Sequence, residues 1–264
     1  MQKVVYMDYA ATTYTKKEVL DEMIPYFGEH YGNPSSVYSI SRDTRKVIDS
    51  SRDKVAKAIN ADRNEIFFTG GGTEADNFAI KGFAFANFNK GNHIITSKIE
   101  HHAVLHSCEY LEKHGFEITY LDVDEEGFIN LEQLKSAIKD NTILVSIMFA
   151  NNEIGTIQPI KEIGQICRDK NVVFHTDAVQ AVGHIPVDVK EMNIDMLSLA
   201  AHKFYGPKGV GALYIKKGIK IDNLIHGGAQ ERGKRAGTEN IAGIVGLSKE
   251  IGRASCRERV FAGC

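Results

Sequence analysis

Short apolar runs rich in β-branched residues alternate along the chain with longer amphipathic stretches. The runs have the length of buried strands, whereas the stretches between them repeat their apolar positions with a helical period of about 3.6 residues. Alternation of this kind predicts βαβ units and a mostly parallel sheet. The predicted strands are 65–69, 93–97, 117–121, 143–148, 172–176 and 195–199, and the clearest helical stretches are 73–88 and 160–170.

A seventh apolar run, Val210 to Ile215, follows the sixth strand after only a short glycine-rich turn. A parallel crossover needs a dozen or more residues, so this run is predicted to be antiparallel. The sheet is then mixed, and we expect a three-layer α/β/α fold. Residues 1–15 are predicted to form an N-terminal arm, a helix is expected at 16–27, and residues 16–250 are assigned to one large domain.

The pattern stops at Ile251. Residues 251–260 show neither helical nor strand periodicity and resemble the translation of a common sequencing adapter. We therefore predict that 251–264 is a non-native sequencing scar. The alternative is a native tail without fixed structure.

Composition narrows the function without specifying it. The 264 residues are 43% hydrophobic and 25% charged, which is typical of a soluble domain with one large core. A net charge of −2 without any basic block disfavours a general nucleic-acid surface. The N-terminus has no apolar leader, and no apolar run reaches membrane-spanning length, so we expect a cytoplasmic protein without a membrane partner.

The four cysteines, Cys108, Cys167, Cys256 and Cys264, show no CxxC spacing. This usage favours a reducing compartment and argues against both a zinc knuckle and disulfides.

Residues able to do chemistry follow several of the predicted strands. Gly70 to Asn77 follows the first strand and opens a helix, so free backbone amides near Gly72 and the Thr73 hydroxyl are a candidate phosphate cradle. His101 follows the second strand and lies where ligands collect in parallel sheets. His102 and His106 have metal-ligand spacing, but no third ligand is near, and an exposed helix face is the preferred interpretation.

Two further strands end in polar side chains. Asn152 comes after the strand at 143–148, and Asp177 and Gln180 follow the strand at 172–176. A carboxylate and an amide one helical turn apart can face the same ring. Taken alone, an aspartate at a strand end is most often a helix cap.

A lysine completes the series. Lys203 stands 26 residues after Asp177, just beyond another strand, with His202 beside it. A lysine that forms a Schiff base, with a carboxylate to keep a pyridine nitrogen protonated, is the chemistry of pyridoxal phosphate (PLP). Lys208 competes for this role, but its Pro-Lys-Gly setting is typical of a turn.

With these residues in place, the chain resembles the cysteine desulfurases of the NifS and IscS group, in the class V aminotransferase family of fold type I. The resemblance covers about 250 residues. It is carried by the segments above and by Tyr6 to Thr13, Tyr31 to Ser36 and Arg235 to Asn240.

The resemblance implies a role for each matching residue. Lys203 would carry the cofactor and move protons, His101 would stack on its ring, and Asp177 would pair with the ring nitrogen. The phosphate contacts implied are Gly72, Thr73, His202 and, from the partner subunit of a homodimer, Thr238; those to the ring oxygen are Asn152 and Gln180.

The activity implied is removal of sulfur from L-cysteine to give L-alanine and an enzyme persulfide, which a sulfur-acceptor or scaffold protein would receive for iron–sulfur cluster or thiocofactor assembly. The alternatives are a selenocysteine lyase, another class V aminotransferase or an inactive scaffold.

Two departures from the family pattern stand out. Ala200 occupies a position where the family usually has serine, which removes a hydroxyl from the phosphate site. The family's nucleophilic cysteine and substrate-binding arginine belong to a smaller C-terminal domain that we expect to be missing. None of the four cysteines is assigned a catalytic role, so the chain is expected to be inactive in sulfur transfer.

Overall fold

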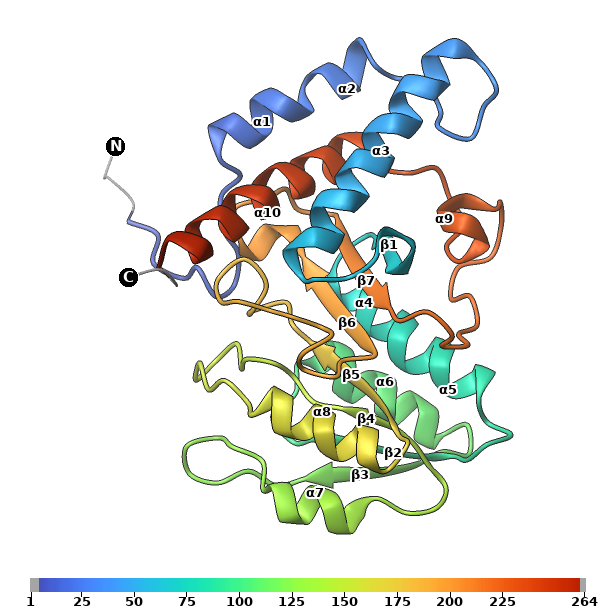
Figure 1. The fold of residues 1–264 in the computed structure, drawn as a ribbon, viewed down its shortest axis with the longest axis vertical. Coiled ribbons are helices and arrows are strands. Elements are labelled where there is room, and N and C mark those ends of the chain that lie inside the picture. Colours follow the sequence, from blue (N-terminus) through green and yellow to red (C-terminus); the bar gives the residue numbers. More distant parts are fainter. Residues whose placement is uncertain (1–4, 262–264) are drawn as a thin grey trace.

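A seven-stranded mixed sheet forms the centre of the molecule in a computed structural model that describes the backbone of residues 5–261 and the side chains of residues 5–253 (Figure 1). The strand order is β1-β7-β6-β5-β4-β2-β3. Strand β7 runs antiparallel to both neighbours, and the other pairs are parallel. The strands are β1 (Ile66–Thr69), β2 (His93–Ser97), β3 (Glu117–Leu121), β4 (Thr142–Ser146), β5 (Val173–Asp177), β6 (Met196–Ala200) and β7 (Gly211–Ile215).

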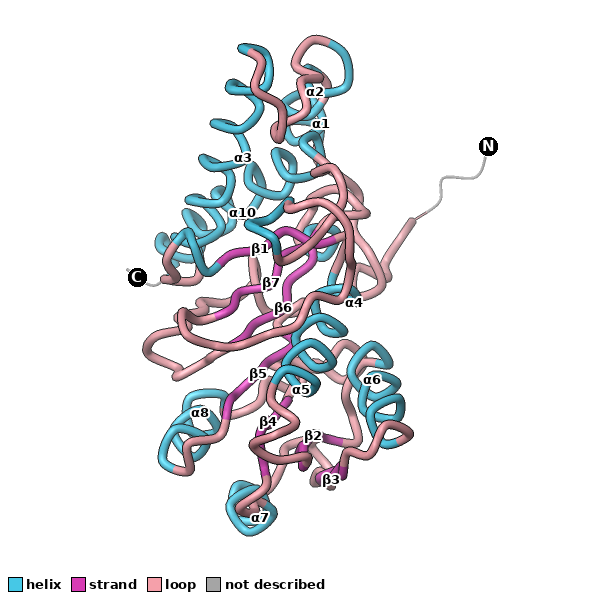
Figure 2. The backbone as a smooth tube through the Cα atoms, turned by 90° about the vertical axis from the view of Figure 1, so that its right-hand side faces the viewer, coloured by secondary structure: helices cyan, strands magenta, loops and turns pink. Residues whose placement is uncertain are grey.

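Helices cover both faces of the sheet, which gives the predicted three-layer fold (Figure 2). One face carries α4 (Gly72–Asn77), α5 (Phe83–Ala86) and α6 (His102–Glu112). The other carries α3 (Ser39–Ala58), α7 (Leu131–Ala137), α8 (Ile160–Asp169) and α10 (Ile241–Phe261). Alternation along the strands supplies both cores, so Ile94 packs on the first face and Ile95 on the second.

The pattern of strands predicted from the sequence is confirmed, but two helices differ. The helix expected at 16–27 is split into α1 (Lys17–Met23) and α2 (Pro25–Gly28), because a proline cannot donate the hydrogen bond that would continue the first helix. The helix expected at 73–88 is interrupted between α4 and α5 by a π-helical segment, Phe78–Gly82.

The backbone stays helical after residue 250, although residues 251–260 lack helical periodicity. Helix α10 runs from Ile241 to Phe261 and packs along α3 and α1, and its buried Glu250 carboxylate pairs with Lys16, the residue that precedes α1. Side chains beyond Arg253, including Cys256, and residue Cys264 lie outside the described part. The non-native origin of residues 251–264 therefore stays a prediction.

The parallel strands place the predicted functional residues at one edge of the sheet. Strands β2, β4, β5 and β6 all run in the same direction, so their carboxyl ends meet there. His101, Asn152, Asp177 and Lys203 each lie at or just after one of these ends. A crevice at the carboxyl edge is where ligands bind in sheets of this kind.

The edge strand β1 is closed by charged side chains rather than by another strand. Arg52 and Arg232 both donate to the Ile66 carbonyl at 2.7 Å, and the Phe68 N–H donates to the Glu231 carboxylate at 2.8 Å. Arg52 and Glu231 form a two-bonded ion pair at 2.6 and 2.8 Å, with both side chains buried. Glu231 and Arg232 adopt left-handed backbone angles, with φ of 46° and 57°. The unpaired backbone groups of an edge strand promote aggregation, and these side-chain contacts provide hydrogen-bond partners for such groups on β1.

We expect Glu231→Gln to lower the free energy of unfolding by about 3–5 kcal/mol, because it leaves the Arg52 charge buried without a counter-ion. Urea denaturation measures the loss. The matched control is Arg63→Ala, which breaks the exposed Arg63–Asp53 pair and should cost at most about 1 kcal/mol. Equal losses in the two variants would contradict the prediction.

Candidate active site

A cavity of about 230 Å³ opens at the carboxyl edge of the central strands. Eight of the nine residues that the sequence nominated line it together: Gly72, Thr73, His101, Asn152, Asp177, Gln180, His202 and Lys203. Ala11, Asp76, Met148, Ala150, Val179 and Ala200 complete the wall. Thr238 is not part of it. The volume equals that of roughly eight water molecules, which is enough for a small ring with substituents.

The start of α4 forms one end of the cavity. A Cβ atom at position 72 would lie 2.7 Å from the Val179 side chain. Only glycine therefore allows the start of α4 to lie this close to Val179. Gly71 has a φ of +152°, within the region that favours glycine. Thr73 lines both this cavity and an adjoining open groove that also contains Lys208. Backbone amides and a hydroxyl therefore converge at this end.

Lys203 lies in the short 3₁₀ turn that follows β6. Its Nζ donates to the carbonyl oxygens of Ala10 and Ala11, so the N-terminal arm crosses the lysine. Gln180 Nε2 donates to the same Ala10 carbonyl at 3.0 Å. Burial lowers the pKa of Lys203, whereas Asp177, Asp8 and Glu153 favour its charged form. A lowered pKa increases the fraction of neutral amine, the nucleophilic form of lysine.

Asp177 ends β5 and is 6% exposed. Its Oδ1 accepts the Val179 N–H at 2.9 Å. Burial raises the pKa of Asp177, while that hydrogen bond and the nearby His101 and Lys203 favour the carboxylate. Asp177 is thus a buried carboxyl group of the cavity whose ionised form is favoured by nearby donors and by Lys203.

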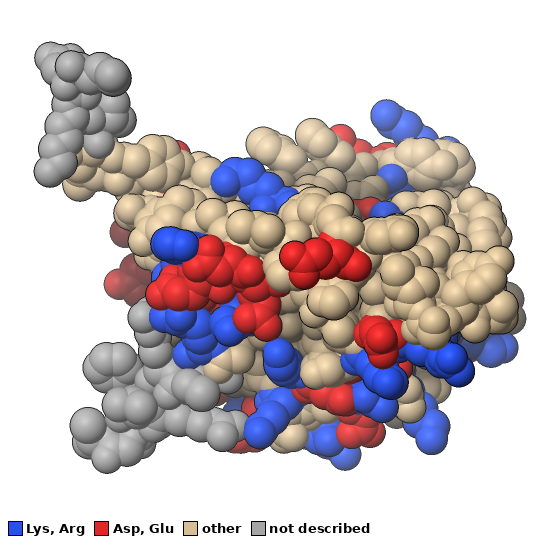
Figure 3. All heavy atoms as spheres, turned by 90° about the horizontal axis from the view of Figure 1, so that it is seen from above, with Lys and Arg blue, Asp and Glu red and all other residues tan. Residues whose placement is uncertain are grey.

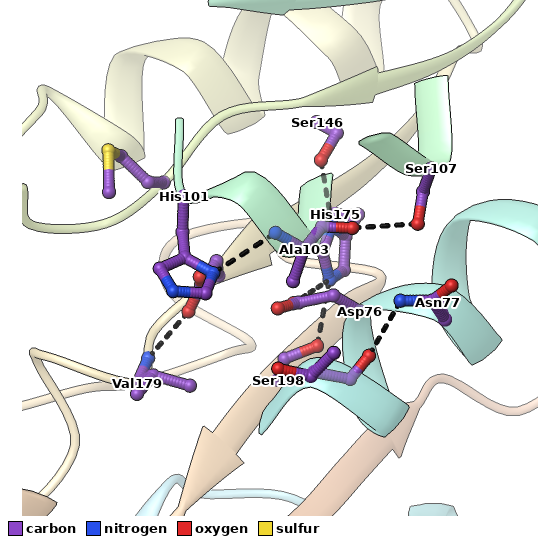
Figure 4. Close-up of polar contacts among 12 residues, drawn as sticks. Asp76, Asn77, His101, Ala103, Ser107, Ser146, His175, Val179 and Ser198 are labelled. Carbon is purple, nitrogen blue, oxygen red and sulfur yellow. Dashed lines mark hydrogen bonds and ion pairs between the residues drawn. The ribbon is translucent and has the colours of Figure 1, made fainter. Parts of the chain in front are cut away.

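The two cavity histidines are held by different contacts. His101 is the N-cap of α6, and its Nδ1 accepts the Ala103 N–H at 3.1 Å, which places the proton of the neutral ring on Nε2 (Figure 4). His202 Nδ1 lies 3.1 Å from the Thr12 hydroxyl of the arm. Burial lowers the pKa of His202, with Lys203 and Lys208 acting in the same direction.

Other side chains considered from sequence lie away from the cavity wall. The rings of His102 and His106 stack 5.1 Å apart, and the described residues contain no group of three potential metal ligands. Cys108 and Cys167 are buried, and burial raises the pKa of both thiols. Among the described residues, no helix is long and apolar enough to cross a membrane.

A buried polar network behind the cavity was missed from sequence. The imidazole of His175 joins the Ser146 hydroxyl at 2.9 Å to the Ser198 hydroxyl at 3.0 Å, and Asp76 Oδ1 lies 3.7 Å from its Nε2 (Figure 4). Glu100 is also buried, and its Oε1 accepts the Ser97 hydroxyl at 2.6 Å and the Met148 N–H at 3.0 Å.

The helical and strand periods could have pointed to two of these residues. Asp76 comes four residues after Gly72, on the same side of the helix that opens the cradle, and His175 comes two residues before Asp177, on the same face of its strand. Serine occurs at both buried and exposed positions, so the pattern of apolar and polar residues does not single out Ser146 or Ser198. Their contacts with His175 could be found only from the pairing of the strands in the sheet.

Known proteins match this chain along almost its whole length. A model of the aminotransferase class V family matches residues 5–254. The chain belongs to the aminotransferase class V family. It is 70% identical over 251 residues to a cysteine desulfurase IscS of Clostridium botulinum, covering 95% of this chain and 63% of that protein. It is 62% identical over 258 residues to a cysteine desulfurase IscS of Methanosarcina thermophila, covering 97% and 64%.

Solved structures of known proteins share the fold. A NifS-like protein superposes with a TM-score of 0.95 at 43% identity, covering 99% of this chain and 72% of that one. A structure described as SspA in complex with cysteine gives a TM-score of 0.92 at 44% identity, covering 94% and 72%. The chain spans about 63% of the length of the curated IscS relatives from Clostridium botulinum.

The cavity of this class V chain fits a phosphorylated pyridine. Gly72 and Thr73 present anion-binding groups at one end, Asp177 presents a buried carboxyl group within, and Lys203 lies at the wall. Ala200 lies where a serine would add a hydroxyl; its Cβ is 3.5 Å from where a Gly72 Cβ would stand. The groups that remain available to an anion at this end are Thr73, His202 and backbone amides.

Burial raises the pKa of Glu100 from 4.5 to about 8, so the folded chain holds this proton more tightly than the unfolded chain. Wild-type stability should fall relative to Glu100→Gln as the pH rises from about 4.5 to 8, by on the order of 4 kcal/mol. Denaturant titrations at a series of pH values measure the difference. Glu109→Gln, at an exposed position of α6, is the control. A stability difference between wild type and Glu100→Gln that does not change with pH would refute the prediction.

Proposed function

We propose that this chain is the PLP-binding part of a cysteine desulfurase, an enzyme that converts L-cysteine to L-alanine and leaves a persulfide on its own nucleophilic cysteine for iron–sulfur cluster or thiocofactor assembly. The observation that carries the proposal is the convergence of Lys203, Asp177 and the Gly72–Thr73 cradle on one cavity. The identity of 70% to a cysteine desulfurase IscS supports the substrate.

When bound, PLP would supply an aldehyde for an amine and a ring that withdraws electrons from the substrate carbon. Lys203 would provide that amine, because burial lowers its pKa, and would later move protons at the substrate carbon. Asp177 would hold the proton on the ring nitrogen. His101 would cover the ring face, with Asn152 and Gln180 as partners for the ring oxygen.

The described residues offer no accessible thiol to receive sulfur. Cys108 and Cys167 are buried, and burial raises their thiol pKa, which disfavours the thiolate nucleophile. The part of the chain described here would therefore perform cofactor and substrate binding and activation of the substrate carbon.

We also propose a homodimer in which Thr238 reaches the partner's phosphate site. Thr238 is absent from the wall of its own cavity, whereas the adjoining groove at Gly70 to Thr73 is open. Of the eighteen large hydrophobic side chains exposed among the described residues, twelve fall between residues 5 and 40. Figure 3 views the end that carries α1, α2 and α3, where broad uncharged areas separate the charged groups. A second copy would cover such a surface.

Borohydride reduction of the PLP-loaded chain should attach the cofactor covalently to Lys203, and Lys203→Ala should abolish attachment. Peptide mass spectrometry locates the modified residue. In the unmodified chain, L-cysteine should change the visible absorbance of bound PLP.

Lys208→Ala serves as the matched control, because Lys208 is the other lysine near the cradle, and it should keep the attachment at Lys203. Attachment at Lys208 would overturn the lysine assignment. Formation of 3-mercaptopyruvate from L-cysteine, in which the amine is lost and the C–S bond is kept, would favour aminotransferase chemistry over desulfuration.

Analytical ultracentrifugation should show a dimer, and Thr238→Ala should weaken PLP binding roughly tenfold or more, the usual cost of one hydrogen bond to a charged group. Thr238→Ser retains the hydroxyl and should bind like the wild type. A monomeric chain whose PLP affinity is unaffected by Thr238→Ala would contradict the dimer proposal.

A further inference from the structure

Asp76 is a buried carboxyl group without a counter-ion. It is 1% exposed and lies on α4, where it contributes to the cavity wall. Its Oδ1 has no hydrogen-bond partner. The nearest group that could carry a positive charge is His175, 3.7 Å away. That imidazole is already held by Ser146 and Ser198 (Figure 4).

His175 cannot supply the missing charge. It is completely buried, and burial lowers its pKa to about 3, so the ring is neutral at physiological pH. A neutral imidazole at 3.7 Å is no substitute for an ammonium or guanidinium group. An unpaired buried carboxylate is costly, and such a group takes up a proton instead.

Of the two buried carboxyl groups, Asp177 has more contacts that stabilise its ionised form than Asp76 has. It accepts the Val179 N–H at 2.9 Å, and the nearby His101 and Lys203 stabilise its carboxylate. The pKa of Asp76 is raised by burial, and further by the charges of Asp177 and Glu100, with only Ser198 opposing. Two adjacent buried carboxyl groups do not both ionise readily, so the proton goes to the group with fewer donors.

We propose that Asp76 is a positioning residue that stays protonated at neutral pH and thereby leaves Asp177 as the ionised carboxylate of the cavity. Asp76 acts through Asp177: an ionised Asp76 would raise the cost of the Asp177 charge. The proposal rests on the proposed function in one respect only: the ionised Asp177 would pair with the ring nitrogen of the cofactor.

The Ser198–His175–Asp76 arrangement is not a hydrolytic triad. Both Ser198 and Asp76 approach the same ring nitrogen, Nε2, whereas a triad uses the two nitrogens for the two partners. Ser198 and His175 are each 0% exposed, so no substrate reaches the hydroxyl. We therefore assign the network to the control of which cavity carboxyl group, Asp76 or Asp177, is ionised.

Carbon NMR of the cofactor-free full chain, labelled with ¹³C at the aspartate carboxyl carbons, tests the proposal directly. At neutral pH one signal should lie at the position of a protonated carboxyl group. It should vanish in Asp76→Asn and persist in Asp177→Asn. In the latter its titration midpoint should fall, because the Asp177 charge that raises the pKa of Asp76 has been removed.

Thermal melts give an independent readout. The native chain binds the Asp76 proton more tightly than the unfolded chain, whose aspartates titrate near 3.8. Wild-type Tm should therefore fall relative to Asp76→Asn as the pH rises from about 4 to 8. If Asp76→Asn fails to fold, the shift of the protonated signal in Asp177→Asn still decides the question.

An Asp76 signal at the ionised position at neutral pH, or a Tm difference that is flat between pH 5 and 8, would overturn the proposal. Both measurements use the chain without PLP, so their failure leaves the proposed function standing. Conversely, absence of PLP binding would sink the proposed function and leave the Asp76 result unaffected.

Discussion

The neutral imidazole of His175 joins the three strands on which the candidate site depends. Through Ser146 and Ser198 it links β4, β5 and β6, and it lies beside Asp76 of α4. Each nitrogen of the ring has a hydroxyl partner, so a polar residue is accommodated in the centre of an apolar sheet without an unsatisfied ring nitrogen. The relative positions of Asp177, Lys203 and the Gly72 cradle are set by the elements that this one side chain connects.

Burial then governs the chemistry of the cavity. Exclusion of water lowers the pKa of Lys203 and raises those of Asp177, Asp76 and Glu100, so the charge of each group is decided by the few donors and cations that reach it. The N-terminal arm contributes to this exclusion, because the carbonyls of Ala10 and Ala11 lie over the lysine. The arm is therefore part of the site rather than an appendage.

Hydrophobic periodicity predicted the sheet because alternating burial is a local property of each strand. Strands 93–97 and 117–121 have the predicted bounds, and β7 is antiparallel as its short connection required. Residues at strand ends could be nominated because parallel strands bring those ends together. Asp76, Glu100 and His175 were missed, since their importance lies in which partners they lack or find across the sheet. The break at Pro25 had a visible signal, whereas the continuation of α10 beyond residue 250 had none, because residues 251–260 lack helical periodicity.

The closure of β1 has a consequence for the order of folding during synthesis. Strand β1 pairs only with β7, which begins at Gly211, and its open side is satisfied by Glu231 and Arg232, which follow later still. A ribosome adds about 5–20 residues per second, so Ile66–Thr69 waits on the order of ten seconds for its first partner. Throughout that interval the nascent chain carries an apolar segment without its strand partner, so β1 is the strand of the sheet that stays unpaired longest during synthesis.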